Sequence, residues 1–297
     1  MNSSSKSRRL CSGDGEDDGV EKGGWWEGLN PEILALIFVR IPADQMVREV
    51  SLVCKSWRAA VAGPYCWTDI DVEQWCRRCN RSDLIDSVVR KLVRRSKCTF
   101  QRLSAYKLGN AAFSFVANCG RCLKVLQIPM SDVTDLMVEK HAESLVNVTV
   151  LDISYCLKIT YKGLDAFGKH CKSLIHLKRN MPPPAWETPT KVVASKIDDR
   201  EAMIIAGKMM GLHHLELGFG HFGDCGLDAI FTKCKALTHL DIQGCWSVEL
   251  EGDLEDKCER LVVFKSPWFD DYDNRFSSDN DSSGADAGEE TSSSDSD

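Results

Sequence analysis

Apolar residues recur along most of this chain with a period in the twenties. Each occurrence places an apolar residue three positions before a second one, and most add a third two positions later. A unit this short holds one strand and one helix and cannot bury its apolar face alone, so neighbouring units must stack. The first residues of the seven occurrences lie 23, 25, 26, 38, 25 and 24 residues apart: Phe100, Leu123, Val148, Leu174, Leu212, Leu237 and Leu261.

This period, with its L-x-x-L-x-L spacing, is typical of leucine-rich repeats. It predicts an α/β solenoid in which about seven leucine-rich repeats, over residues 98–268, form a short open arc. Strands line the concave side of such an arc and offer a surface to a protein partner. An arc of about seven repeats is too open to wrap around a small molecule, so we expect no cofactor.

Charge is unevenly distributed along the 297 residues, whose net charge is −7. Residues 270–297 hold ten acidic residues and one Arg, a net of −9, which leaves +2 on residues 1–269. The nearly neutral remainder gives no reason to propose nucleic-acid binding. No apolar run is long enough to span a membrane, and no apolar signal segment follows the polar start. We therefore expect a protein of the nucleus and/or cytoplasm with no membrane partner.

The composition at the two ends differs from that of the rest of the chain. Residues 1–24 are rich in Ser, Gly and Asp, and residues 269–297 are acidic and rich in Ser. Neither segment holds enough apolar side chains to bury on folding. Both are predicted to be disordered tails.

Five of the fourteen cysteines occupy positions set by the repeat. Three lie three residues before the first leucine of a repeat: Cys171, Cys234 and Cys258. Two lie five residues after the central leucine: Cys156 and Cys245. We expect them to be small buried side chains with free thiols. Cys76-x-x-Cys79 and Cys119-x-x-Cys122 have zinc-like spacing, but about forty residues separate the pairs. Packing is the favoured interpretation, and no metal site is predicted.

Helical patterns precede the repeats. Asn30 is a good N-cap and Pro31 suits the first position of a helix that Pro42 ends. A second helix is predicted from near Ala43, with one apolar face formed by Val47, Val50, Cys54, Trp57 and Val61. Gly63-Pro64 ends this helix. A third helical stretch is predicted over about 82–95, within a helical linker that spans 71–97.

The segment 25–70 resembles the F-box. The resemblance is carried by Leu29-Asn-Pro-Glu-Ile-Leu-x-x-Ile-Phe, Ile41-Pro42, Val50-Ser-Leu-Val-Cys-Lys-x-Trp57-Arg-x-x-Val61 and Trp67. An F-box followed by cysteine-containing leucine-rich repeats resembles the plant F-box/leucine-rich-repeat proteins of the FBW type. The resemblance implies that the F-box binds a Skp-type adaptor, and through it a cullin, while the repeats hold the substrate. The usual Leu-Pro at the start is Leu29-Asn30 here, and we expect adaptor binding to survive this change.

The residues themselves also suggest a partner for this segment. A module of about 45 residues has little core of its own, yet it carries more large apolar residues than one buried face needs. Such a surplus is explained by a partner, although packing on the first repeat remains the alternative. The adaptor-binding residues predicted from the motif are Leu29, Pro31, Ile33, Leu34, Ile37, Ile41, Leu52 and Trp57.

Residues that flank the buried leucines should face the concave surface, because side chains alternate along a strand. Three histidines on consecutive repeats should line up, since neighbouring strands lie about 4.8 Å apart. Stacking of their imidazoles is favoured over metal binding. The mixed charges of these positions suit a protein epitope. The predicted substrate-binding residues, together with one from the insertion described next, are His176, Lys178, Trp186, His214, Glu216, His239, Asp241 and Lys265.

One repeat is longer than the others. Its extra stretch, residues 181–191, holds four of the nine prolines and Trp186. Insertions in repeat proteins map to loops that often lie at the binding face, and a stiff proline-rich loop can present Trp186 at low entropic cost. An inert loop whose Trp covers the next repeat is the equal alternative.

Together these patterns predict a non-enzymatic substrate-recognition subunit of a cullin–RING ubiquitin ligase that directs an unidentified target protein to ubiquitylation and degradation. No Gly-rich phosphate loop, G-x-S-x-G or H-E-x-x-H motif is present. The alternative is a leucine-rich-repeat scaffold with no ligase role. A weaker one is a metal-dependent enzyme that uses the three histidines.

Overall fold

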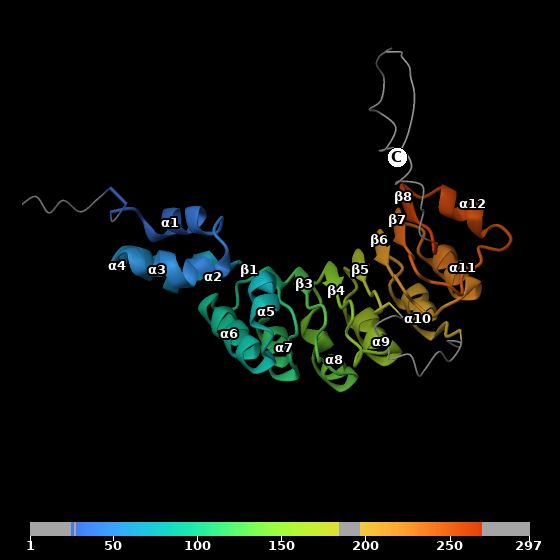
Figure 1. The fold of residues 1–297 in the computed structure, drawn as a ribbon, viewed down its shortest axis with the longest axis horizontal. Helices are drawn as coiled ribbons and strands as arrows, with labels where there is room; N and C mark the ends of the chain where they lie inside the picture. The colour runs from blue at the N-terminus through green and yellow to red at the C-terminus, as the bar shows by residue number, and fades with distance from the viewer. Residues whose placement is uncertain (1–24, 27, 184–196, 269–297) are drawn as a thin grey trace, which may run out of the picture. The chain divides into compact units, whose positions relative to one another are not determined.

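The computed structural model describes residues 25–26, 28–183 and 197–268, and the chain forms two compact units, 1–66 and 67–297. The first unit is helical (Figure 1). The predicted tails 1–24 and 269–297 lie outside the described residues. The helices of the first unit are α1 (Pro31–Phe38), α2 (Ala43–Gln45), the π-helical turn η1 (Met46–Val50), α3 (Ser51–Val53), α4 (Lys55–Ala62) and the short η2 (Pro64–Trp67), which ends across the boundary.

Helix α1 begins where the sequence predicts. Asn30 Oδ1 accepts a hydrogen bond from the backbone N–H of Glu32 at 2.8 Å, and Pro31 is the first helical residue. The side chains of Leu34 and Phe38 are buried on one face of this helix, which packs against α4. The core of the unit therefore lies between α1 and α4.

The predicted second helix is interrupted, and this part of the prediction is wrong. Cys54 adopts an extended backbone conformation, with φ −154° and ψ 174°, and separates α3 from α4. Its Sγ accepts a hydrogen bond from the backbone N–H of Trp57 at 3.4 Å, so Cys54 caps α4 instead of continuing a helix. Val50 and Val61 are buried as predicted, whereas Val47 is only half-buried.

The second unit is a repeat of strands and helices. In its described residues eight strands form one parallel sheet in sequence order: β1 (Asp69–Asp71), β2 (Arg102–Ser104), β3 (Val125–Gln127), β4 (Val150–Asp152), β5 (His176–Lys178), β6 (His214–Glu216), β7 (His239–Asp241) and β8 (Val263–Lys265). The helices are α5 (Glu73–Cys79), α6 (Ser82–Arg95), α7 (Asn110–Cys119), α8 (Asp135–His141), η3 (Ala142–Ser144), α9 (Tyr161–His170), α10 (Arg200–Lys208), α11 (Asp224–Lys233) and α12 (Leu254–Glu259).

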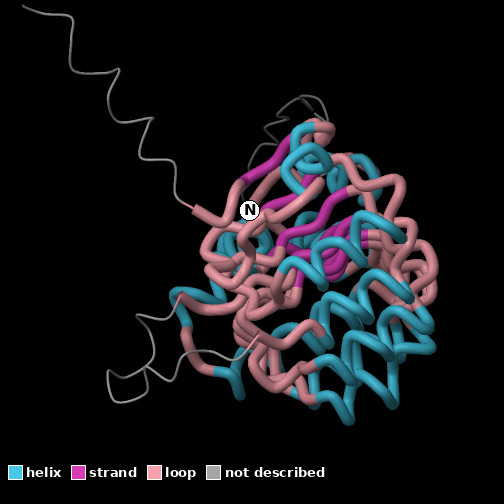
Figure 2. Tube along the Cα trace, turned by 90° about the vertical axis from the view of Figure 1, so that its right-hand side faces the viewer, coloured by secondary structure: helices cyan, strands magenta, loops and turns pink. Residues whose placement is uncertain are grey.

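The strands run along one side of this unit and the helices along the other (Figures 1 and 2). This arrangement confirms the predicted solenoid. The central leucines lie opposite one another in register, for example Leu126, Leu151 and Leu177, and all three are buried. Strand β1 adds a turn before the predicted repeats and pairs with β2. Helix α6 spans Ser82–Arg95, which confirms the predicted helical stretch.

Acidic side chains link neighbouring repeats. Asp135 at the start of α8 accepts hydrogen bonds from the backbone N–H groups of Thr160 at 2.8 Å and Gly163 at 3.0 Å, at the start of the next helix. Asp86 and Asp199 do the same for the repeats that follow them. A Cβ on Gly163 would lie 2.7 Å from Asp135 Oδ1, so this close approach requires glycine. These caps were not predicted from the sequence.

One repeat carries a buried charge in place of an apolar residue. Arg179 follows β5 at the position that Ile153 and Leu217 fill in the flanking repeats, and its side chain is 2 % exposed. Its guanidinium donates to both carboxylate oxygens of Glu201, at 3.0 and 3.2 Å. It also donates to two backbone carbonyl oxygens, so the charge is paired and makes four hydrogen bonds.

Candidate functional site

The helical unit exposes a group of large apolar side chains. Three of the predicted adaptor-binding residues are exposed, with Ile33 at 48 %, Ile37 at 41 % and Leu52 at 77 %. Leu36 and Val53 are also exposed, at 72 % and 62 %, and were not predicted. So many apolar side chains on a small unit indicate a surface that a partner covers.

A fourth predicted residue, Pro31, is also exposed, but the others are less accessible. Leu29 and Ile41 are half-buried. Leu34 is fully buried, so its side chain holds the core of the helical unit and is not available to a partner. Its selection was wrong because it lies on the face of α1 that packs against α4.

The half-buried side chain of Trp57 lies between the core of the helical unit and its surface. Its ring lies edge-on to Phe38, with centroids 4.9 Å apart, and to Trp26 at 6.2 Å. Its indole N–H is buried without a hydrogen-bond partner. The side chain is therefore mainly a packing element of the helical unit, with part of its ring at the surface.

The three predicted histidines do line up on the sheet. His176 lies opposite His214, and His214 lies opposite His239, in consecutive strand pairs. The first two rings stack with centroids 4.0 Å apart, and the second pair stacks at 5.0 Å. The half-buried imidazoles thus form a continuous column on the strand-lined surface, and the predicted stacking of the three rings is confirmed.

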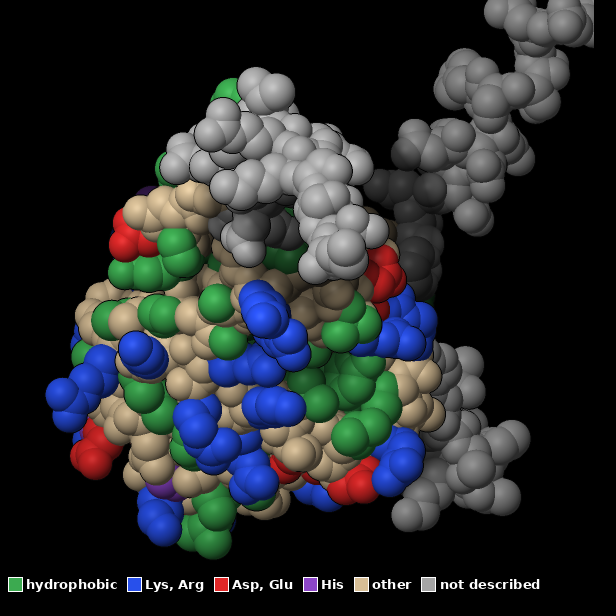
Figure 3. All heavy atoms as spheres, turned by 90° about the vertical axis from the view of Figure 1, so that its left-hand side faces the viewer, with side chains coloured by type: hydrophobic (Ala, Val, Ile, Leu, Met, Phe, Trp, Pro, Cys, Tyr) green, Lys and Arg blue, Asp and Glu red, His purple; other side chains and the backbone are tan. Residues whose placement is uncertain are grey.

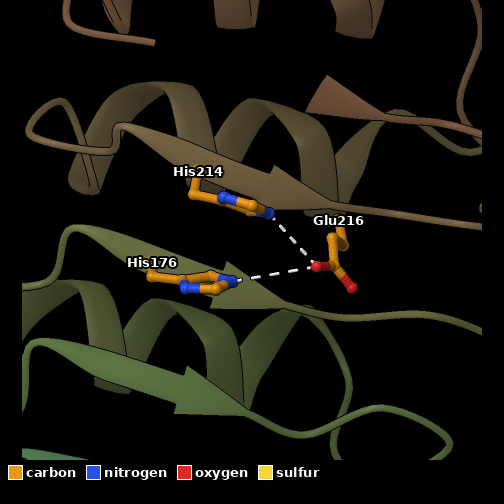
Figure 4. A group of neighbouring side chains, drawn as sticks. All are labelled: His176, His214 and Glu216. Carbon is orange, nitrogen blue, oxygen red and sulfur yellow. Dashed lines mark hydrogen bonds and ion pairs between the residues drawn. The ribbon is translucent and has the colours of Figure 1, made fainter. Parts of the chain in front are cut away.

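Glu216 is the centre of the polar contacts beside this column (Figure 4). Its Oε1 lies 2.8 Å from Lys178 Nζ, 3.2 Å from His214 Nε2 and 3.8 Å from His176 Nε2. Burial raises the pKa of Glu216, but the nearby His176 ring and the ion pair with Lys178 outweigh burial and hold it well below its ordinary value. Burial and the neighbouring His176 lower the pKa of His214, which favours a neutral imidazole.

Asp241 and Lys265 also pair on this surface. Lys265 Nζ lies 2.8 Å from Asp241 Oδ2, and this hydrogen bond raises the pKa of Lys265. Seven of the eight predicted substrate-binding residues therefore lie on strands β5 to β8, and their charges are matched within the surface. Trp186 and most of the insertion lie outside the described residues.

The repeat-position cysteines are buried as predicted. Cys156 and Cys245 are hydrogen-bonded through their thiols to the carbonyl oxygens of Ile128 and Leu217, each at 3.2 Å. Burial raises the pKa of both thiols to about 12, so they are poor nucleophiles and poor metal ligands at neutral pH. Within the described ranges the two Cys-x-x-Cys pairs do not form a cluster of three or more metal ligands.

The near-neutral net charge of residues 1–269 conceals a basic region. Helix α6 exposes Arg90, Lys91 and Arg94. Lys and Arg side chains, in blue, are frequent on the surface that Figure 3 shows. Arg94 lies over the ring of Phe115 at 5.5 Å. The run of basic residues from Arg90 to Lys97 was visible in the sequence, but summing charge over the whole chain hid it.

Across the residues that the structure describes, no helix has both the length and the apolar character needed to cross a membrane. The fold and its surfaces thus define a class of protein: a small helical module with an exposed apolar face, followed by a leucine-rich-repeat solenoid with a polar strand surface.

Comparison with known proteins identifies the family. Residues 26–73 match the model of the F-box-like family. The chain is 39 % identical over 228 residues to F-box protein FBW2 of Arabidopsis thaliana, covering 76 % of this chain and 70 % of that protein. It is 31 % identical over 267 residues to the Arabidopsis F-box protein SKIP1, covering 84 % and 87 %. It is 28 % identical over 278 residues to F-box/LRR-repeat protein 22 of Arabidopsis thaliana, an alignment that covers 92 % of this chain and 87 % of that protein.

The chain belongs to the plant F-box/leucine-rich-repeat family, which confirms the resemblance seen in the sequence. Plant F-box proteins generally serve as substrate receptors of ubiquitin ligases, and the F-box is the part that binds a Skp-type adaptor. Members of the family are typically non-catalytic.

Proposed function

We propose that this protein is the substrate-recognition subunit of an SCF-type cullin–RING ubiquitin ligase. In this proposal the exposed apolar face of the helical unit binds the Skp-type adaptor, and the strand surface of the repeats binds a target protein for ubiquitylation and degradation. The protein itself transfers no ubiquitin. It would act in the nucleus or cytoplasm, where its many free thiols would stay reduced.

The observation that carries this proposal is the exposure of Leu52, Val53, Leu36 and Ile33 on a unit with little core of its own. Burying such side chains at an interface stabilises a complex, whereas leaving them in water favours aggregation. The family match supports the choice of partner, since it covers this unit.

The adaptor contact can be tested with the double variant Ile33→Ala/Leu52→Ala in the full chain. If both side chains are buried by the adaptor, binding should weaken by ~2–5 kcal/mol, which is roughly 30-fold or more. Titration of the purified chain with a Skp-type adaptor measures the change. Leu157→Ala is the matched control, because Leu157 is 62 % exposed but lies in the repeats.

Two outcomes would contradict the proposal. Adaptor binding that is equal in the double variant and the control would mean that the apolar face has another role. A chain that captures a cellular partner but binds no Skp-type adaptor would be a repeat scaffold without a ligase role.

The substrate contact is tested on the strand surface. Lys178→Ala and His239→Ala should reduce recovery of ubiquitylated target from cells with blocked proteasomes, while adaptor binding stays normal. The reason is that both side chains are half-buried on the strand surface of the repeats, Lys178 on β5 and His239 on β7. Unchanged recovery in both variants would place the target elsewhere on the molecule.

A further inference from the structure

Three potential metal ligands converge on the strand surface. His176 on β5 and His214 on β6 direct their Nε2 atoms at the same oxygen of Glu216, which follows His214 by two residues (Figure 4). One ligand atom from each of the three residues lies within 4.8 Å of the other two. No other group of His, Cys, Asp and Glu side chains in the described part of the chain meets this condition.

The N–O distances suit a single ion, which the two Nε2 atoms can share once the His176 and His214 rings rotate out of their present 4.0 Å stack. Zn²⁺ binds imidazole nitrogen and carboxylate oxygen at about 2.0–2.2 Å, so two ligands at a tetrahedral angle lie about 3.4 Å apart. The two N–O separations here, 3.2 and 3.8 Å, bracket that value. His176 Nε2 is also buried without a hydrogen-bond partner, so a ligand atom is available.

We propose that His176, His214 and Glu216 form a site for a divalent transition metal of the Zn²⁺ class. Two imidazoles and a carboxylate are ligands that such ions prefer, and three protein ligands leave a fourth position open. His214 and His176 are partly exposed, with side chains 34 % and 23 % accessible, so an ion can enter from solvent. The site does not depend on the proposed ligase function, because its residues all lie in the repeats.

Lys178 sets the affinity of this site. Its Nζ lies 2.8 Å from the same Glu216 oxygen that would bind the ion, so the ammonium group and the metal compete. The Lys178 side chain is 30 % exposed and flexible enough to move into solvent. Removing this competitor should therefore strengthen metal binding, which is the opposite of what removing a ligand does.

The test uses the full chain and Co²⁺, whose visible spectrum reports its ligands. Titration should give one equivalent with the spectrum of nitrogen and oxygen ligands and without a thiolate-to-metal charge-transfer band, which separates this site from the fourteen cysteines. Competition with Zn²⁺ then gives the zinc affinity.

Variants connect the binding to these residues. His214→Ala and Glu216→Gln should each weaken Zn²⁺ binding at least about tenfold. His221→Ala should change nothing, because His221 is exposed outside the sheet. Lys178→Met should strengthen binding by about fivefold, the equivalent of one partly exposed ion pair. Melting temperatures show whether each variant is folded.

Three results would overturn the site. The first is no saturable uptake of Co²⁺ or Zn²⁺ by the folded chain. The second is a thiolate charge-transfer band that accounts for all the bound Co²⁺. The third is zinc affinity that is unchanged in folded His214→Ala and Glu216→Gln, or weaker in Lys178→Met.

Discussion

The pair of the buried Arg179 and the half-buried Glu201 gives the sharpest prediction for stability. Replacing Glu201 by Gln keeps the shape of the side chain but removes its charge. The Arg179 guanidinium then remains in a position that is only 2 % exposed, without a charged partner. We expect Glu201→Gln to destabilise the repeats far more than a surface substitution does.

The structure sets the size of the effect. Arg179 keeps its hydrogen bonds to the carbonyl oxygens of Ile159 at 2.6 Å and Cys156 at 3.1 Å, and loses its charge-assisted bonds to Glu201. Removing one partner of a buried pair costs about 3–5 kcal/mol. Because the Glu201 side chain is 32 % exposed, water offsets part of this cost, and ~3 kcal/mol is expected.

A second variant separates charge from packing. The double change Arg179→Ile/Glu201→Gln places in this repeat the apolar residue that Ile153 supplies in the preceding one. This variant removes the buried charge together with its partner's charge, which is often close to neutral, although the carbonyl oxygens of Cys156 and Ile159 lose their donor. The double variant should therefore recover most of the lost stability and lie within about 1 kcal/mol of the original chain.

The assay is urea unfolding followed by circular dichroism, supported by thermal melting. A loss of ~3 kcal/mol corresponds to a melting temperature about 6–12 °C lower for a domain of this size. Arg200→Gln is the control, because the Arg200–Asp198 pair is exposed and contributes little. The reasoning fails if Glu201→Gln costs no more than this control, or if the double variant is less stable than the single one.

Three further predictions concern other parts of the chain. Burial raises the pKa of the Cys156 thiol to about 12, so iodoacetamide should label it near pH 8 only after unfolding; fast labelling of native protein, read by mass spectrometry, would contradict this. Gly163→Ala should lower the free energy of unfolding by ~1–3 kcal/mol, because the added Cβ would clash with Asp135. In the same urea assay Gly207→Ala should leave that free energy unchanged or raise it, since a Cβ there meets no atom within 4 Å. Deleting residues 182–190, or changing Trp186 to Ala, should lower substrate recovery by the equivalent of ~2 kcal/mol with normal melting and adaptor binding; unchanged recovery would make the insertion an inert loop.

Repeat positions were predictable where the same contact recurs in every turn of the solenoid. The leucines of β2 to β7 and the repeat cysteines have the same neighbours in each repeat, so their spacing alone predicts burial. Strand β1 was missed because it has one apolar residue, Ile70, between two aspartates. Its three residues form a strand because they pair with β2, and pairing is not visible in a local pattern.

The apolar surface of the helical unit was predictable in kind but not in detail. A surplus of large apolar residues shows that some must be exposed, but it does not show which ones. Leu34 and Leu36 are two residues apart on α1 and lie on different faces, with Leu34 buried and Leu36 72 % exposed. The choice between them depends on where α4 packs, and the break at Cys54 that positions α4 was not predicted.

The strand surface shows why residue types alone do not give a binding mode. His176 and His214 are 38 residues apart, yet they lie directly opposite each other, because Leu177 and Leu215 must both stay in the core. A shift of either strand by one residue would turn its leucine outwards, so an insertion between the strands leaves their register unchanged. The same register places Lys178 beside Glu216, and these charges satisfy each other before any partner arrives. A partner that binds here must replace or bridge such pairs, so its shape and hydrogen bonds matter more than its net charge.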